Sequence, residues 1–243
     1  MSHVICVDGL GGNPEITFSD LKVELERLKH TVHLAPITEI TDHNGRIDYV
    51  IGSIAMVRGQ YPGQRYFLIG QSAGGSAVRC AVAQLSEAEL PDGIVLLSSA
   101  MPRWIWPATS TLLCKIAKYG RKLIQSEPIR LRDADYLDLI GPIRDDVKKA
   151  ILDGQVPTPP REARELAFYP APYRPVGCNV TIIYGSHDRW VRPRAQEVFA
   201  KRVRALASKA RKRTVVSIHC IKGAGHLTLL HREAIQLVSR SVY

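Results

Sequence analysis

Residues 67–78 read FLIGQSAGGSAV, an apolar run followed by a glycine-containing turn and a series of small residues. The apolar run predicts a buried strand, and the small residues after Ser72 predict a helix that can approach a sheet closely. Ser72 has the pattern Gly-x-Ser-x-Gly around it, with Gly70 and Gly74 on its two sides. Between a strand and a helix, this pattern is typical of a nucleophile elbow, which presents the serine hydroxyl at the carboxyl edge of a sheet. We therefore expect Ser72 to be a nucleophile, with an incidental tight turn as the alternative.

Strand and helix signals alternate along the chain, which favours an α/β fold with a mostly parallel sheet of about six strands flanked by helices. The predicted strands, all short and largely apolar, span residues 3–8, 31–35, 66–69, 93–99, 179–184 and 214–221. The predicted helices lie after Gly12, near 47–60, from 73, over 199–213 and from about 226 to 238. The first of them has Phe18, Leu21, Leu25 and Leu28 on one stripe, and either Asn13 with Pro14 or Thr17 starts it.

The fourth and fifth predicted strands are separated by residues 101–175, far more than a parallel crossover needs. Helical stretches are expected within this segment, near residues 110–120, 133–140, 142–152 and 160–168. The sequence thus predicts a core made of residues 1–100 and 176–243 and a helical cap or lid insertion at 101–175.

A serine hydroxyl is a poor nucleophile unless a base takes its proton, and the base needs a carboxylate to hold its tautomer. The chain supplies both groups in order, each just after a predicted strand. Asp188 lies in the turn after 179–184, and His226 follows the glycine-containing loop after 214–221. Because parallel strands end at one edge of their sheet, we expect Ser72, Asp188 and His226 to meet there as a catalytic triad.

The other histidines are weaker candidates for the base. His219 lies inside a predicted strand and His187 adjoins the proposed acid. Four further histidines are expected at solvent-exposed positions, namely His30, His33, His43 and His231.

An acyl-transfer site also needs N–H donors for the oxyanion. One donor is expected from Ala73, at the start of the helix after Ser72, and the other from Leu10, in the glycine loop after the first strand. That loop does not fit a dinucleotide fingerprint, which would need glycine where Pro14 stands, and the chain has no G-K-[ST] phosphate loop. No cofactor is therefore expected.

The composition indicates a globular domain, since 45% of the 243 residues are hydrophobic and 23% are charged. No apolar run approaches the roughly 20 residues of a bilayer-spanning helix, so no transmembrane segment is expected. The five cysteines form no CxxC pair and no metal-spaced cluster, which favours free, buried thiols in a cytoplasmic protein without a metal site.

The formal net charge of +10 is concentrated in part at residues 201–213, KRVRALASKARKR. Apolar residues recur there at helical spacing, so the segment predicts an amphipathic helix with a basic outer face. This face is either simply solvated or a contact for a polyanion or membrane surface. Nucleic acid is not expected as a partner, because no aromatic interleaving or nucleic-acid motif accompanies the charges.

Together, the elbow, the acid loop, the histidine loop and the insertion after the fourth strand resemble the α/β-hydrolase fold family, in particular serine esterase or lipase-like members with a helical cap. The resemblance extends over nearly the whole chain. It implies hydrolysis through an acyl-enzyme, in which Ser72 attacks a carbonyl, His226 moves the proton and Asp188 orients His226. The backbone N–H groups of Leu10 and Ala73 would hold the oxyanion.

Two features depart from the family pattern. The family commonly has His-Gly where this chain has Asp8-Gly9, and Asp8 is expected to alter the local charge without removing the backbone donor. The chain also begins directly at the strand that feeds this loop, so it resembles a compact version lacking the family's usual first strands.

The substrate is less closely defined, because this fold hosts many chemistries. Four large apolar residues follow the fourth strand, namely Met101, Trp104, Ile105 and Trp106. They are expected either to line an apolar acyl pocket or to pack the cap against the core. A small to medium apolar carboxylic ester is the predicted small-molecule substrate. A lactonase, a thioesterase, a carbon–carbon bond hydrolase and a hydrolase-like ligand-binding protein remain open, as does the oligomeric state.

Overall fold

The computed structural model describes residues 1–9, 12–37, 40, 42–99, 145–153, 177–209 and 214–243. Its strands are β1 (His3–Val7), β2 (Thr31–Ala35), β3 (Tyr66–Gln71), β4 (Gly93–Leu97), β5 (Asn179–Gly185) and β6 (Val216–Ile221). Its helices are α1 (Pro14–Thr17), α2 (Ser19–Arg27), α3 (His43–Gln60), α4 (Ala73–Val82), α8 (Asp145–Leu152), α10 (Pro193–Lys209) and α11 (Arg232–Ser241). Two short 3-10 helices, η1 (Glu87–Glu89) and η2 (Thr228–Leu230), complete the described elements.

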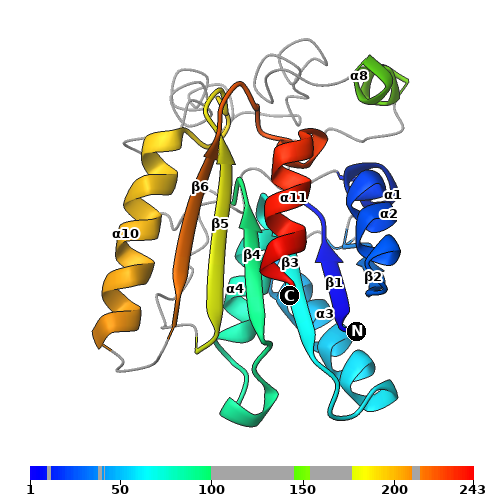
Figure 1. Ribbon diagram of the computed structural model, residues 1–243, viewed down its shortest axis with the longest axis vertical. Coiled ribbons are helices and arrows are strands. Elements are labelled where there is room, and N and C mark those ends of the chain that lie inside the picture. The colour runs from blue at the N-terminus through cyan, green and yellow to red at the C-terminus, as the bar shows by residue number, and fades with distance from the viewer. Residues whose placement is uncertain (10–11, 38–39, 41, 100–144, 154–176, 210–213) are drawn as a thin grey trace, which may run out of the picture.

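The six strands form one sheet in the order β2-β1-β3-β4-β5-β6, and every neighbouring pair is parallel (Figure 1). The prediction of an α/β fold with a parallel sheet of about six strands is therefore confirmed. All six predicted strands are present, and their ends differ from the predicted ones by two residues or fewer. β3 lies near the middle of the sheet, so the residues that follow it are flanked by the ends of β1 and β4.

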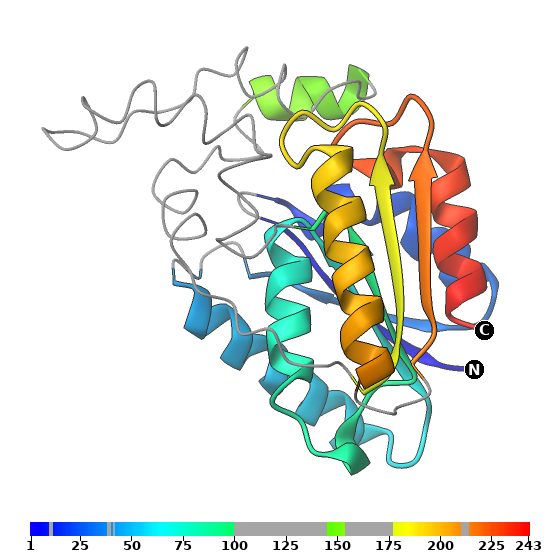
Figure 2. The same ribbon diagram turned by 90° about the vertical axis from the view of Figure 1, so that its left-hand side faces the viewer.

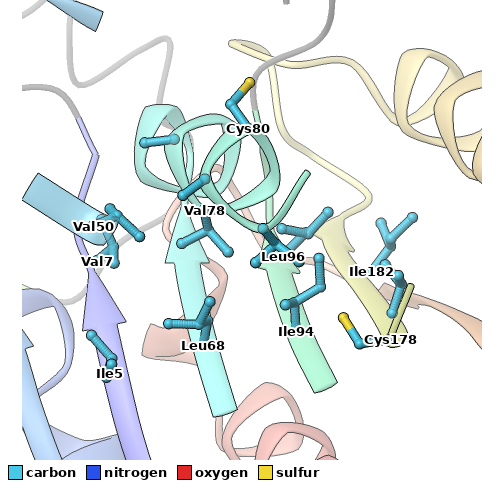
Figure 3. Close-up of a cluster of buried hydrophobic side chains, with 14 of the residues drawn as sticks. Ile5, Val7, Val50, Leu68, Val78, Cys80, Ile94, Leu96, Cys178 and Ile182 are labelled. Atoms are coloured by element: carbon cyan, nitrogen blue, oxygen red, sulfur yellow. The ribbon is translucent and has the colours of Figure 1, made fainter. Parts of the chain in front are cut away.

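Alternate residues of the strands point to opposite faces, as the pleat of a β-strand requires. One face buries the side chains shown in Figure 3, including Ile5, Leu68, Ile94 and Ile182, beneath α3, α4 and α10. The small residues of α4 allow this helix to lie close to β3, as the run after Ser72 predicts. The opposite face buries a second set of strand residues beneath α2 and α11, among them Cys6, Ile69 and Leu97. Figure 1 shows α11 in front of the sheet and α4 behind it.

The helices differ from the predictions mainly at their ends. The first predicted helix is two helices, since α1 is capped by the Asn13 side chain and Phe18 interrupts the run before α2. Phe18, Leu21 and Leu25 are fully buried, as their shared stripe predicts. α3 begins earlier than expected, at the Asp42 side chain, which accepts the Gly45 N–H at 2.7 Å. The last helix begins later than predicted, because η2 intervenes after His226.

Most of the predicted cap lies outside the described residues. Of the helices expected within 101–175, the structure describes α8, which occupies the greater part of the stretch predicted at 142–152. Figures 1 and 2 show α8 beyond the ends to which the strand arrows point, which is the carboxyl edge of the sheet. The division of the chain into a core and a cap stays a prediction. Among the described residues, no helix has the length and apolar character needed to span a bilayer.

Candidate active site

Ser72 occupies a strained turn between β3 and α4. Its φ is 52° and its ψ is −118°, a backbone conformation that residues other than glycine rarely adopt. The turn is held from both sides, since the Ser72 N–H donates to the Leu97 carbonyl at 2.8 Å and the Ser72 carbonyl accepts the Gly75 N–H at 3.1 Å. Such a conformation persists only where the surrounding structure fixes it. The local geometry is that of the elbow which the sequence pattern predicts.

The glycines on the two sides of Ser72 allow close approaches of the backbone. A Cβ on Gly70 would clash with the Gly75 Cα, and a Cβ on Gly74 would clash with the carbonyl oxygens of Val7 and Asp8. The start of α4 therefore lies directly against β3 and against the end of β1. This contact brings the loop after β1 next to Ser72, because a Cβ on Gly9 would lie 3.0 Å from the Ser72 Cβ.

Replacing Gly74 by alanine is expected to destabilise the fold by about 1–3 kcal/mol, because one methyl group overpacks a site closed by backbone. Gly52, in the interior of α3, gives a matched control, since a Cβ there meets nothing within 4 Å. Gly52→Ala is expected to stabilise the fold by roughly 0.5–1 kcal/mol through the better helix propensity of alanine. Urea denaturation of both variants measures the two effects, and equal midpoints would contradict the close approach at Gly74.

Ser72, His226 and Asp188 form a chain of hydrogen bonds at the carboxyl edge of the sheet. His226 Nε2 lies 2.9 Å from Ser72 Oγ, and His226 Nδ1 lies 2.9 Å from Asp188 Oδ2. The three residues are 9%, 5% and 2% exposed, respectively. A carboxylate only accepts, so Nδ1 carries the hydrogen in this pair, which leaves the Nε2 lone pair to accept the serine hydroxyl. The structure thus brings together the three residues predicted as a triad.

The Asp188 carboxylate is fixed by its own turn. Its Oδ1 accepts the N–H groups of Trp190 at 2.9 Å and Val191 at 2.8 Å, which leaves Oδ2 directed at His226. The turn is joined to the histidine loop, because the His187 N–H donates to the Ala224 carbonyl at 2.8 Å. The acid and the base are therefore held by two loops that bind each other.

Two further residues beside His226 were missed by the sequence reasoning. The Gln71 side chain donates from Nε2 to the His226 carbonyl at 2.9 Å. The ring centroids of Trp190 and His226 are 5.9 Å apart, and the angle between their planes is 30°. Gln71 is the residue between Gly70 and Ser72, and Trp190 follows the acid by two positions. Both lie within two positions of a predicted site residue, which is the one signal that could have found them.

Of the two predicted oxyanion donors, Ala73 is the fully buried first residue of α4, next to Ser72, and Leu10 lies outside the described residues. The predicted pocket residues, Met101, Trp104, Ile105 and Trp106, also lie outside them. Within the described part of the chain, no group of three or more His, Cys, Asp or Glu residues is placed to hold a metal ion.

Asp8 places a buried carboxylate beside this site. It is 1% exposed, and burial raises the pKa of its carboxyl to about 6, an effect that hydrogen bonds from Gly9 and Thr17 oppose. The folded chain therefore holds a proton on Asp8 that the unfolded chain releases at its ordinary value of 3.8. The resulting stabilisation is complete below pH 3.8 and is lost as the pH rises through about 6.

The pH dependence of stability is expected to change when Asp8 is replaced by asparagine, which removes the titration but keeps the side-chain shape. Between pH 4 and 7 the wild type should lose on the order of 3 kcal/mol relative to Asp8→Asn, which is the size of the pKa shift expressed as free energy. Urea midpoints at each pH measure the difference. Parallel curves for the two proteins would contradict the raised pKa.

The predicted exposure of the remaining histidines is partly wrong. His30 and His43 are only 7% and 4% exposed, and burial lowers the pKa of both, that of His43 to about 4. His30 packs edge-on against the ring of Tyr243, and His43 is covered at the start of α3. His33 and His231 are half-buried.

The prediction of free, buried cysteines is confirmed in part. The thiols of Cys6, Cys80 and Cys178 are free and buried, whereas Cys220 is free and exposed, and Cys114 lies outside the described residues.

Comparison with known proteins supports the resemblance. No curated protein matches the chain significantly. A solved lipase-esterase related protein from Clostridium acetobutylicum superposes with a TM-score of 0.69 at 15% identity, covering 99% of this chain and 93% of its own. A monoacylglycerol lipase from Paleococcus ferrophilus gives 0.64 at 16% identity, with coverages of 98% and 94%, and a thermophilic esterase from Thermogutta terrifontis gives 0.62 at 17%, with 100% and 90%. The model of the alpha/beta hydrolase family matches residues 9–237. With nearly its whole length matched, this chain belongs to the alpha/beta hydrolase family.

Proposed function

We propose that this hydrolase cleaves carboxylic esters of small to medium apolar acyl groups through an acyl-enzyme formed on Ser72. The observation that carries the proposal is the unbroken hydrogen-bond chain from Asp188 through His226 to Ser72, with both distances at 2.9 Å. Serine hydrolysis needs a nucleophile within about 2.6–3.2 Å of its base, and a third group that orients the base.

In the first half of the reaction, Ser72 Oγ attacks the ester carbonyl while His226 Nε2 takes the hydroxyl proton. The carbonyl π electrons move onto oxygen, and the backbone N–H of Ala73, together with a donor predicted at Leu10, would stabilise that charge. Asp188 stabilises the imidazolium that forms, because its Oδ2 faces Nδ1. When the tetrahedral intermediate collapses, the proton on Nε2 passes to the alkoxide that leaves.

In the second half, His226 acts in the opposite sense. It removes a proton from water, the hydroxide equivalent attacks the acyl-enzyme carbonyl, and collapse returns the Nε2 proton to Ser72 Oγ. The products are one alcohol and one carboxylic acid for each water consumed. The buried setting of the three side chains favours this chemistry, since charges that develop away from bulk water interact more strongly with fixed dipoles.

The structural neighbours are described as a lipase-esterase related protein, a monoacylglycerol lipase and an esterase, which is consistent with ester hydrolysis. An apolar acyl group is favoured by the aromatic and aliphatic residues predicted near the nucleophile, at Met101, Trp104, Ile105 and Trp106. The same three side chains also suit lactones, thioesters and carbon–carbon bonds next to a carbonyl, so the leaving group is the feature that the experiment must resolve.

A substrate panel tests the proposal. The full chain is assayed on p-nitrophenyl esters from acetate to dodecanoate, on the matching thioesters and on a series of lactones, with Ser72→Ala as the blank. We expect the highest kcat/KM on an ester of short to medium chain, and a fluorophosphonate adduct found by mass spectrometry on Ser72. Higher kcat/KM on thioesters or lactones would reassign the leaving group. An intact, folded protein that turns over none of these compounds would refute the hydrolase proposal, and slow single modification with a large rise in Tm would favour a ligand-binding protein.

A further inference from the structure

Asp8 is a buried acid that the proposed mechanism does not use. It is the first residue after β1, and both of its carboxylate oxygens are bonded. Oδ1 accepts the backbone N–H of Gly9 at 2.6 Å, and Oδ2 accepts the Thr17 hydroxyl of α1 at 2.9 Å. Burying a carboxylate costs free energy. A buried carboxylate with both oxygens hydrogen-bonded therefore points to a specific structural role for Asp8.

The bond to Gly9 fixes the peptide that lies beside the nucleophile. A Cβ on Gly9 would approach the Ser72 Cβ at 3.0 Å and Ser72 Oγ at 3.6 Å, so the Gly9 backbone lies against the serine side chain. Because its N–H is committed to Asp8, Gly9 is not available as an oxyanion donor. A donor from this loop would then be another peptide N–H, which the sequence predicts at Leu10.

Gly12, at the far end of the same loop, also contacts Asp8. A Cβ on Gly12 would clash with both carboxylate oxygens and the Cγ of Asp8, so the Gly12 backbone lies directly on the carboxylate. The Gly12 N–H donates to the Gly9 carbonyl at 3.3 Å, which ties the two ends of the loop to each other. Asp8 thus contacts the loop where it begins and where it ends, and Thr17 connects the same carboxylate to α1.

We propose that Asp8 is a positioning residue, whose carboxylate bridges Gly9, Gly12 and Thr17 and so fixes the two described ends of the loop after β1, beside Ser72, where the transition state of acyl transfer requires them. The inference rests on the proposed function, and it adds a role for a residue that departs from the His-Gly common in the family. Asp8 touches no reacting atom. It acts through the backbone of the loop, so its loss should affect the transition state more than the bound substrate.

Three variants separate this role from a general contribution to folding. Asp8→Ala removes both bonds. Asp8→Asn keeps an oxygen for the Gly9 N–H and an amide that can donate to the Thr17 hydroxyl. Thr17→Val removes only the bond to α1. Asp92→Ala is the matched control, because Asp92 also accepts a backbone N–H, that of Tyr66 at 3.1 Å, but at the amino end of the sheet.

The full-length proteins are assayed on the best p-nitrophenyl ester from the panel, with Tm measured beside kcat and KM. For Asp8→Ala we expect kcat to fall about 10- to 100-fold while KM changes less than about threefold, the pattern of an interaction made in the transition state. Affinity for a trifluoromethyl ketone, which forms an oxyanion on Ser72, should fall by a similar factor. Asp8→Asn should recover most of the lost kcat, and Thr17→Val should lie between Asp8→Ala and the wild type.

An Asp8→Ala protein with wild-type kcat and ketone affinity would overturn the proposal. So would an Asp92→Ala protein that loses as much kcat as Asp8→Ala, because the effect would then follow stability rather than position. If Asp8→Ala does not fold, Asp8→Asn and Thr17→Val carry the test. A Thr17→Val protein with both wild-type kcat and wild-type ketone affinity would then contradict the proposed bridge. If the wild type cleaves no acyl compound, the proposed function itself is refuted. This outcome differs from failure of the Asp8 proposal, which requires an active wild type and compares the variants with it.

Discussion

Replacing Ser72 by alanine is expected to lower kcat by a factor of about 10⁴ or more, the largest effect of any single change considered for this chain. The variant loses the attacking oxygen, while Asp188 and His226 keep their mutual hydrogen bond at 2.9 Å. Any residual rate comes from binding and from the oxyanion donors, because no covalent intermediate can form. KM should change little if Ser72 makes its main contribution in the transition state.

The measurement is steady-state turnover of the best ester by wild type and Ser72→Ala, together with fluorophosphonate labelling followed by mass spectrometry. Ser76→Ala is the matched control, since Ser76 lies one turn further along α4 and is also buried. We expect Ser76→Ala to keep wild-type labelling and a kcat within about threefold, because alanine is well suited to a helix interior. Retained turnover in Ser72→Ala, after removal of any contaminating esterase, would contradict the role of Ser72 as nucleophile.

The parallel sheet could be predicted from the sequence because each strand is a short apolar run. Strands buried on both faces lack the alternation of a half-exposed strand, and runs such as VICV and IVLL in this chain have that character. Helix ends were predicted less well. The N-cap at Asp42 and the break at Phe18 depend on single side-chain contacts and on tertiary packing, which periodicity does not report.

Ser72, Asp188 and His226 could be located because each lies in the turn or loop after a predicted strand, and parallel strands bring their carboxyl ends to one edge. The contacts of Gln71 and Trp190 with His226 could not, since each joins loops that are distant in sequence. The burial of His30 and His43 was missed for the same reason. The sequence indicated that Asp8 departs from the family pattern, but its hydrogen bond with Thr17 depends on where α1 packs relative to the end of β1.

Replacing Asp188 by asparagine is expected to lower kcat by about 10³- to 10⁴-fold with the fold intact. The asparagine oxygen can still accept the Trp190 and Val191 N–H groups that Asp188 Oδ1 accepts, which directs the amide nitrogen at His226 Nδ1. An amide N–H needs an acceptor there, so the imidazole adopts the tautomer with its hydrogen on Nε2. That nitrogen then faces Ser72 Oγ as a donor and cannot take the hydroxyl proton.

The expected loss has two causes, the wrong tautomer of His226 and the missing stabilisation of the imidazolium. Steady-state kinetics gives the loss in kcat, and the Tm of Asp188→Asn should stay close to that of the wild type since the turn keeps its two backbone bonds. His187→Ala is the matched control, because His187 is the exposed neighbour of Asp188 in the same turn and the nearest rival base. It should retain kcat within about threefold. A large loss in His187→Ala, with near wild-type rates in Asp188→Asn, would assign the proton transfer to a different histidine and remove Asp188 from the mechanism.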